Sequence, residues 1–160
     1  MEYQCATVGR VVYVRFDHGD DLMAELVRLA RQEKIRCAWF HLFGGLAGAG
    51  VVTGPREPTV PPEPVWEQVE DTREVLGTGS IFLDGEEPKI HLHAAMGHHG
   101  KTLTGCVRRD TEVYLVMEAV LFEITGLDVS RPWFAEGGFF RPTFTGAGGK
   151  EEVPADGGNS

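Results

Sequence analysis

The chain has 160 residues, of which 42% are hydrophobic and 24% charged, and its formal net charge at pH 7 is −9. This length and composition are typical of one globular domain with a single core. The negative charge argues against a strong grip on phosphate backbones, which depends on clustered Lys and Arg. Arg108-Arg109 is the only adjacent basic pair, so we do not expect nucleic acid as a partner.

The sequence gives no sign of export or of a membrane span. It lacks a charged amino-terminal region followed by an apolar run, and no apolar stretch is long enough to cross a bilayer. Its cysteines, Cys5, Cys37 and Cys106, are odd in number and widely spaced, which suits a reducing compartment better than a disulfide framework. We therefore expect a cytoplasmic protein without membrane contact, in which Cys5 and Cys37 pack as reduced thiols.

The first predicted elements are a strand and an amphipathic helix. Residues 9–16 are rich in β-branched and aromatic side chains, and the following Asp and Gly residues break the strand. Apolar residues then recur at three- and four-residue steps from Leu22 to Ala30, with Gly19 or Asp20 available as the N-cap. This pattern predicts a helix that packs on a sheet.

The remainder of the body reads as strands and loops. Residues 35–43 predict a buried strand that leads into a glycine-rich run, and the proline-rich residues 55–64 predict a surface loop. Further strand character spans residues 67–82 and 112–125, and an aromatic strip spans 131–144. We expect one domain over residues 1–145, followed by a disordered, acidic, Gly-rich tail over residues 146–160.

Four of the six histidines lie between Pro88 and Cys106. In a strand His91 and His93 share one face, about 7 Å apart at the backbone. The segment Gly97-His98-His99-Gly100 predicts a hairpin turn, because glycine accepts the positive φ that short loops need. If the turn is centred on His98 and His99, His91 lies opposite Cys106 and Thr104 lies opposite His93.

This pairing would bring two imidazoles and a thiol together on one face, and zinc sites with two His and one Cys are known. The alternative is a solvated histidine pair beside a cysteine that fills the core. Spacing alone leaves both interpretations open. His98 and His99 lie on the predicted turn, where we expect solvation.

Glu118 lies in the middle of the last long apolar strand, between Met117 and Ala119. Burial of an unpaired carboxylate is costly, so we expect Glu118 to meet a cation, a hydrogen-bond donor or the metal site. An ion pair with Arg15 or Arg141 is the structural alternative. Glu118 and Arg15 are therefore the candidate catalytic residues.

Several spaced motifs resemble the plants and prokaryotes conserved (PPC) domain family over residues 9–126. Residues 15–22 resemble its entry into the helix, and residues 42–49 resemble its glycine-rich segment after the next strand. Residues 89–93 match the His-Leu-His strand of prokaryotic members, and Glu118 falls near an acidic position of the final strand. Cys106 departs from the pattern, because many members carry a third His there.

The resemblance implies an α+β fold, with a mainly antiparallel sheet and one or two packed helices, in a homotrimer. It also implies a fold relationship to acetolactate decarboxylase, an enzyme with His-bound zinc. On this basis we expect zinc as the cofactor, with His91, His93 and Cys106 as its ligands.

Two functions from different classes remain open. The first is a metalloenzyme that acts on a small carbonyl or carboxylate compound, in which Glu118 or Arg15 moves protons or binds a carboxylate. The second is a DNA-binding or regulatory protein without catalysis, by analogy with plant relatives that carry an AT-hook. The chain contains no Arg-Gly-Arg core of such a hook.

Overall fold

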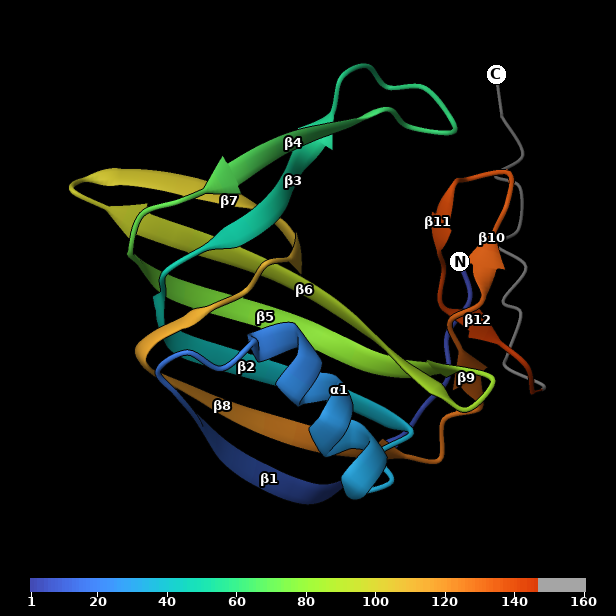
Figure 1. Cartoon of the computed structure of the whole chain (residues 1–160). Coiled ribbons are helices and arrows are strands. Elements are labelled where there is room, and N and C mark those ends of the chain that lie inside the picture. Colours follow the sequence, from blue (N-terminus) through green and yellow to red (C-terminus); the bar gives the residue numbers. More distant parts are fainter. Residues whose placement is uncertain (147–160) are drawn as a thin grey trace, which may run out of the picture.

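Figure 1 shows the computed structural model of the chain, in which residues 1–146 are described. These residues form one helix and an eight-stranded antiparallel sheet in the order β1-β8-β2-β5-β6-β7-β3-β4. The main elements are β1 (Thr7–Asp17), α1 (Leu22–Gln32), β2 (Cys37–Leu46), β3 (Ala49–Pro55), β4 (Pro64–Val69), β5 (Arg73–Asp84), β6 (Glu87–His98), β7 (Lys101–Arg109) and β8 (Val113–Thr125). The predicted α+β class is confirmed. Apart from Gly146, the predicted tail lies outside the described residues.

The helix begins at Leu22, where the predicted apolar pattern begins, but its N-cap is not the predicted one. Its N-cap is Asp21, whose carboxylate accepts hydrogen bonds from the backbone N–H groups of Met23 and Ala24 and from the hydroxyl of Thr111. Asp20 has another role, since its carboxylate accepts from the backbone N–H of Asp17. The N-cap prediction of Gly19 or Asp20 was therefore wrong.

The core lies between α1 and one face of the sheet (Figure 1). Its large side chains, all fully buried, include Leu22, Leu26, Phe40, Leu92 and Met117. Side chains alternate along a strand, so burial of Leu92 on β6 directs its neighbours on that strand to the other face. We call this other face, which points away from α1, the outer face of the sheet.

Gly79 on β5 allows a close approach inside the core. A Cβ atom at this position would lie 2.3 Å from Cζ of Phe40 and 2.5 Å from the backbone oxygen of His91. Gly79 is paired with Phe40 on one side and with Leu92 on the other. Because glycine has no Cβ, the Phe40 ring can pack directly against the backbone of β5 where it pairs with β6.

Residues 126–146, which we call the C-terminal segment, form four short strands in two pairs. These are β9 (Val129–Ser130), β10 (Trp133–Phe134), β11 (Phe139–Phe140) and β12 (Thr143–Phe144), with β10 paired to β11 and β12 to β9. In Figure 1 the segment, drawn in orange and red, stands beside one end of the large sheet. The backbone N–H of Arg131 donates to the backbone oxygen of Leu83 at 2.7 Å, which attaches the segment to the end of β5.

Two further expectations concern the surface. Within residues 1–146, no helix is long and apolar enough to cross a membrane. Cys37 is buried as a free thiol, as predicted, whereas Cys5 is exposed, because the chain before β1 lies outside the core. The prediction that Cys5 packs was therefore wrong.

Candidate metal centre

The hairpin of β6 and β7 has a two-residue turn, as predicted, but the turn lies one residue later in the chain than the sequence predicted. His99 and Gly100 are its two loop residues, with φ values of 45° and 76°, and His98 pairs with Lys101. Positive φ at both loop positions is the geometry that matches the twist of a two-residue hairpin. The turn is thus centred one residue later than the predicted one.

The pairing across the hairpin changes accordingly by two residues. Cys106 lies opposite His93, and Thr104 lies opposite Ala95. The predicted pairs, His91 with Cys106 and His93 with Thr104, were therefore wrong. Because a shift of two residues preserves the face of each side chain, His91, His93 and Cys106 still share the outer face.

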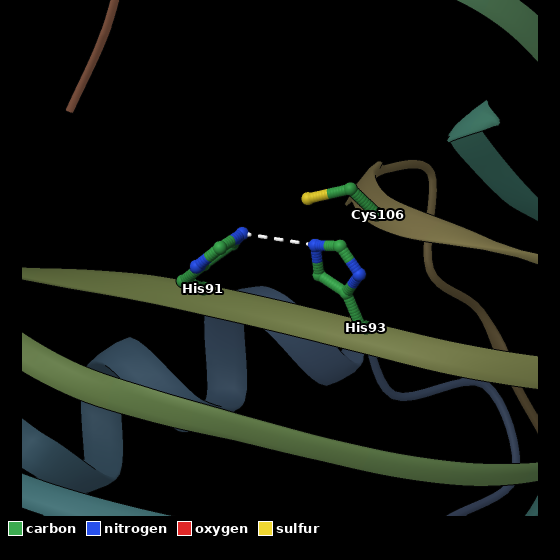
Figure 2. A group of neighbouring side chains, drawn as sticks. All are labelled: His91, His93 and Cys106. Atoms are coloured by element: carbon green, nitrogen blue, oxygen red, sulfur yellow. Dashed lines mark hydrogen bonds between the residues drawn. The ribbon is translucent and has the colours of Figure 1, made fainter. Parts of the chain in front are cut away.

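The three side chains meet (Figure 2). His91 and His93 rise from β6 on the side away from the helix, and Cys106 points toward them from β7. The two Nε2 atoms are 3.1 Å apart, and the three potential ligand atoms all lie within 4.8 Å of one another. Tetrahedral zinc with Zn–N bonds of about 2.0 Å separates two nitrogen ligands by about 3.3 Å, so the imidazoles already have the required spacing.

The surroundings favour the neutral form of His91. Its pKa falls to about 4, first because neighbouring groups displace water from its ring and then because of the positive charges of Arg131, His93 and Arg108. Burial raises the pKa of the Cys106 thiol, while Arg108 and Arg131 act in the opposite direction. A neutral imidazole has the free lone pair that a metal ion requires, and the thiol must lose its proton to become a good ligand.

Arg131, in the C-terminal segment, is a site residue that the sequence analysis missed. Only 3% of its surface is exposed, and its Nη2 donates to the hydroxyl of Ser80 at 2.9 Å. Its guanidinium lies 4.9 Å from the ring centre of Phe82. Ser80 is paired with His91, which places Arg131 beside the metal candidate. An arginine inside an apolar aromatic strip was the one available signal.

A cavity of about 680 Å³ opens beside two of the three donors. His93 and Cys106 contribute to one wall, and Arg108, two residues after Cys106 on β7, lies next to them. The opposite walls are aromatic and come from β4 and the C-terminal segment; they include Trp66, Trp133, Phe139 and Phe140. The aromatic strip predicted over residues 131–144 thus covers this cavity.

The two candidate catalytic residues lie elsewhere on the outer face. Glu118 is on β8, paired with Arg15 of β1 and Phe43 of β2. Three strand spacings separate β8 from β6, which is about 14 Å and too far for direct action on the three donors within one chain.

Glu118 meets a hydrogen-bond donor, which is one of the expected partners, and not an arginine. The hydroxyl of Tyr13 donates to the carboxylate of Glu118, and Arg15 forms its ion pair with Asp17 at 2.9 Å. The expected ion pair of Glu118 with Arg15 or Arg141 is therefore absent from the described residues. The catalytic role of Glu118 and Arg15 stays a prediction.

The turn histidines do not join the cluster. His99 is exposed, as expected. His98 is partly buried, and its Nδ1 donates to the backbone oxygen of Thr72 at 2.6 Å, so its predicted solvation was wrong. Within residues 1–146, the set of His91, His93 and Cys106 is the one group of three His, Cys, Asp or Glu side chains close enough to share a metal ion.

Comparison with known proteins supplies a family and a fold. The model of the Plants and Prokaryotes Conserved (PCC) domain, also written PPC, matches residues 3–125. Among curated proteins a sequence search finds no match. The matched range ends with β8, so the C-terminal segment with Arg131 lies beyond it.

Three solved structures illustrate the fold. The metal-containing protein AF0104 of Archaeoglobus fulgidus superposes with a TM-score of 0.77 at 20% identity, over 88% of this chain and 98% of that chain. A PPC protein of Pyrococcus horikoshii gives 0.72 at 21% identity, over 88% and 96%. A protein of Ralstonia eutropha, described as a "Putative DNA-binding protein", gives 0.69 at 19% identity, over 82% and 90%.

Proposed function

The chain belongs to the Plants and Prokaryotes Conserved domain family, and on that premise we propose that it binds zinc through His91, His93 and Cys106. We further propose that the bound metal serves a reaction on a small carbonyl or carboxylate compound. The observation that carries the proposal is the convergence of two imidazoles and one thiol on the outer face of a single hairpin.

The spacing of the two imidazoles supports a metal ion more than a simple hydrogen bond. At 3.1 Å, one Nε2 must carry a hydrogen that the other accepts, which uses only two of the three groups. A metal ion would be shared by all three. The donor set also suits zinc, since imidazole and thiolate are its usual protein ligands.

The cavity gives a small molecule access to these donors. His93 and Cys106 form part of its wall, so a compound in the cavity lies next to the proposed ligands. When bound, zinc supplies a Lewis acid that polarises a carbonyl oxygen or lowers the pKa of a bound water. Around it, the aromatic side chains exclude water, and Arg108 provides a positive charge.

Metal content of protein purified without an affinity tag tests the proposal. We expect about one zinc per chain in the wild type and loss of zinc in His91→Ala, His93→Ala and Cys106→Ala. His41→Ala is the matched control, because His41 is exposed on the same outer face but lies two strands from His93. It should retain the metal.

The proposal has a clear contrary result. If the wild type contains no metal and takes up none after zinc is added, both the metal site and the enzyme function fall. If zinc binds but survives all three substitutions, the site lies elsewhere. A change in circular dichroism would identify any variant that loses metal only because it does not fold.

DNA binding is not proposed for this chain. Two structural relatives are described in those terms, but the present chain carries a net charge of −9 and no Arg-Gly-Arg core. A mobility-shift assay with random duplex DNA at low salt should show no complex, because non-specific affinity comes mainly from clustered positive charge. A complex that weakens as salt rises would contradict this expectation.

Self-association as a homotrimer is proposed, following the resemblance to the family. The outer face exposes several large apolar side chains within four consecutive strands of the sheet, β1-β8-β2-β5; these are Val11 and Tyr13 on β1, Trp39 and Phe43 on β2, and Leu76 on β5. Contiguous exposed apolar surface of this kind is typical of contact between subunits. A second copy is the occupant that the family resemblance favours.

A further inference from the structure

Arg131 is a buried positive charge without a carboxylate partner. Its Nη2 donates to Ser80, but its Nε has no hydrogen-bond partner among the described residues. No ion pair within residues 1–146 includes Arg131. A buried charge is costly unless it is paired, so the fold holds Arg131 where an anion would be favourable.

The position of Arg131 connects this charge to the metal candidate. Ser80, its hydrogen-bond partner, is directly paired with His91. Arg131 does not itself line the cavity, but the Nε2 of His91 is 3.1 Å from that of His93, which does line it. Arg131 therefore lies within electrostatic reach of the cavity wall.

A second arginine faces the cavity itself. Arg108 lines the cavity beside Cys106, and it forms no ion pair within the described residues. Further positive charge lies next to a lining residue, since the Nζ of Lys89 is 4.8 Å from the ring centre of Phe140. None of the described lining residues is acidic. In a chain of net charge −9, this local excess of positive charge needs a specific explanation.

The rest of the lining is suited to a flat apolar group. Trp66, Trp133, Phe139 and Phe140 supply aromatic surface. The ring of Trp133 packs edge-on against Phe140, with the centroids 5.2 Å apart, which keeps the aromatic wall in place. A cavity of about 680 Å³ falls within the size range of sites for small ligands.

We propose that this cavity binds a small organic anion with a planar apolar body, whose anionic group is neutralised by Arg108 and Arg131 beside His93 and Cys106. The body of the ligand lies against the aromatic walls. The inference deepens the proposed function by naming the charge and shape of its substrate class, and it rests on that function only for the role of the metal.

Three probes of similar shape test the charge requirement. Benzoate and phenyl phosphate carry an anionic group on a ring, and benzamide is the neutral counterpart of benzoate. Binding is measured on the full chain by isothermal titration at low salt, with zinc and again after treatment with a chelator. Benzoate should bind at least tenfold more tightly than benzamide, and phenyl phosphate shows whether phosphate is preferred over carboxylate.

Substitutions of the arginines locate the site. Arg108→Met and Arg131→Met should each reduce the preference for benzoate over benzamide at least tenfold. Arg31→Met, in α1 on the opposite side of the sheet, is the control and should leave it unchanged. If Arg131→Met does not fold, Arg131→Lys, which keeps the charge but loses the planar fork, should weaken benzoate binding less than Arg108→Met does.

The outcomes separate this inference from the proposed function. Equal affinity for benzoate and benzamide, or a preference that survives both methionine variants, overturns it even if zinc binds. A preference for the anions that depends on both arginines supports it, and it does so even if the protein proves to bind no zinc.

Discussion

Gly79→Ala should destabilise the fold and disturb the metal site at the same time. The added Cβ would lie 2.3 Å from Cζ of Phe40 and 2.5 Å from the backbone oxygen of His91. Normal contacts begin above about 3 Å, so either the aromatic ring or strand β6 has to move. Overpacking of this kind costs about 1–3 kcal/mol, which corresponds to a decrease in Tm of about 2–12 °C for a chain of this size.

Thermal unfolding of metal-free protein, followed by zinc titration, measures both effects. Gly97→Ala is the matched control, because it lies on β6, the strand paired with β5, and its added Cβ has only the backbone oxygen of Glu74 near it, at 3.9 Å. We expect Gly79→Ala to lower Tm and weaken zinc binding, and Gly97→Ala to change both much less. Equal effects of the two substitutions would refute the role assigned to the close approach at Gly79.

Three further results are expected. Zinc binding at pH 7.5 should release about one proton, from the Cys106 thiol, because His91 is already neutral. Calorimetric titration in buffers of different ionisation enthalpy should detect this proton for the wild type and no such release for Cys106→Ala. The metal-free protein should lose stability as pH falls from about 6.5 to about 4, since the unfolded chain protonates His91 before the folded chain does. In urea unfolding, His91→Gln should lose less stability than the wild type over that pH range, and an identical loss would disprove the role of His91. By light scattering the wild-type protein should have the mass of three chains, and a monomeric wild type would contradict the trimer. Phe43→Glu should reduce the mass to that of one chain, whereas Val60→Glu, in the exposed loop between β3 and β4, should leave it unchanged.

The sequence predicted the faces of the hairpin better than its register. Side-chain alternation along a strand places His91 and His93 on the same face of the sheet wherever the turn lies, and burial of Leu92 between them identifies that face as the outer one. The register depends on which two residues occupy the turn. Gly97 and Gly100 flank the histidines symmetrically, so composition alone could not show that His99 takes a positive φ and Gly97 stays in the strand.

Contacts between distant parts of the chain were out of reach of the sequence analysis. Arg131 and Ser80 are 51 residues apart, and nothing in either neighbourhood indicates that they meet. The N-cap shows the same limit on a smaller scale, because the choice of Asp21 over Asp20 is supported by the hydroxyl of Thr111, far along the chain. Local patterns indicate which elements form, while tertiary contacts decide among neighbouring residues of similar type.

The candidate site is built from two separate parts of the chain. The three candidate metal donors lie on the sheet, inside the range that the family model matches, whereas Arg131 and most of the aromatic wall belong to the C-terminal segment beyond it. Selection can therefore act on the two parts separately. If both proposals hold, a change in the segment would alter which ligand this chain accepts while the candidate metal donors stay the same.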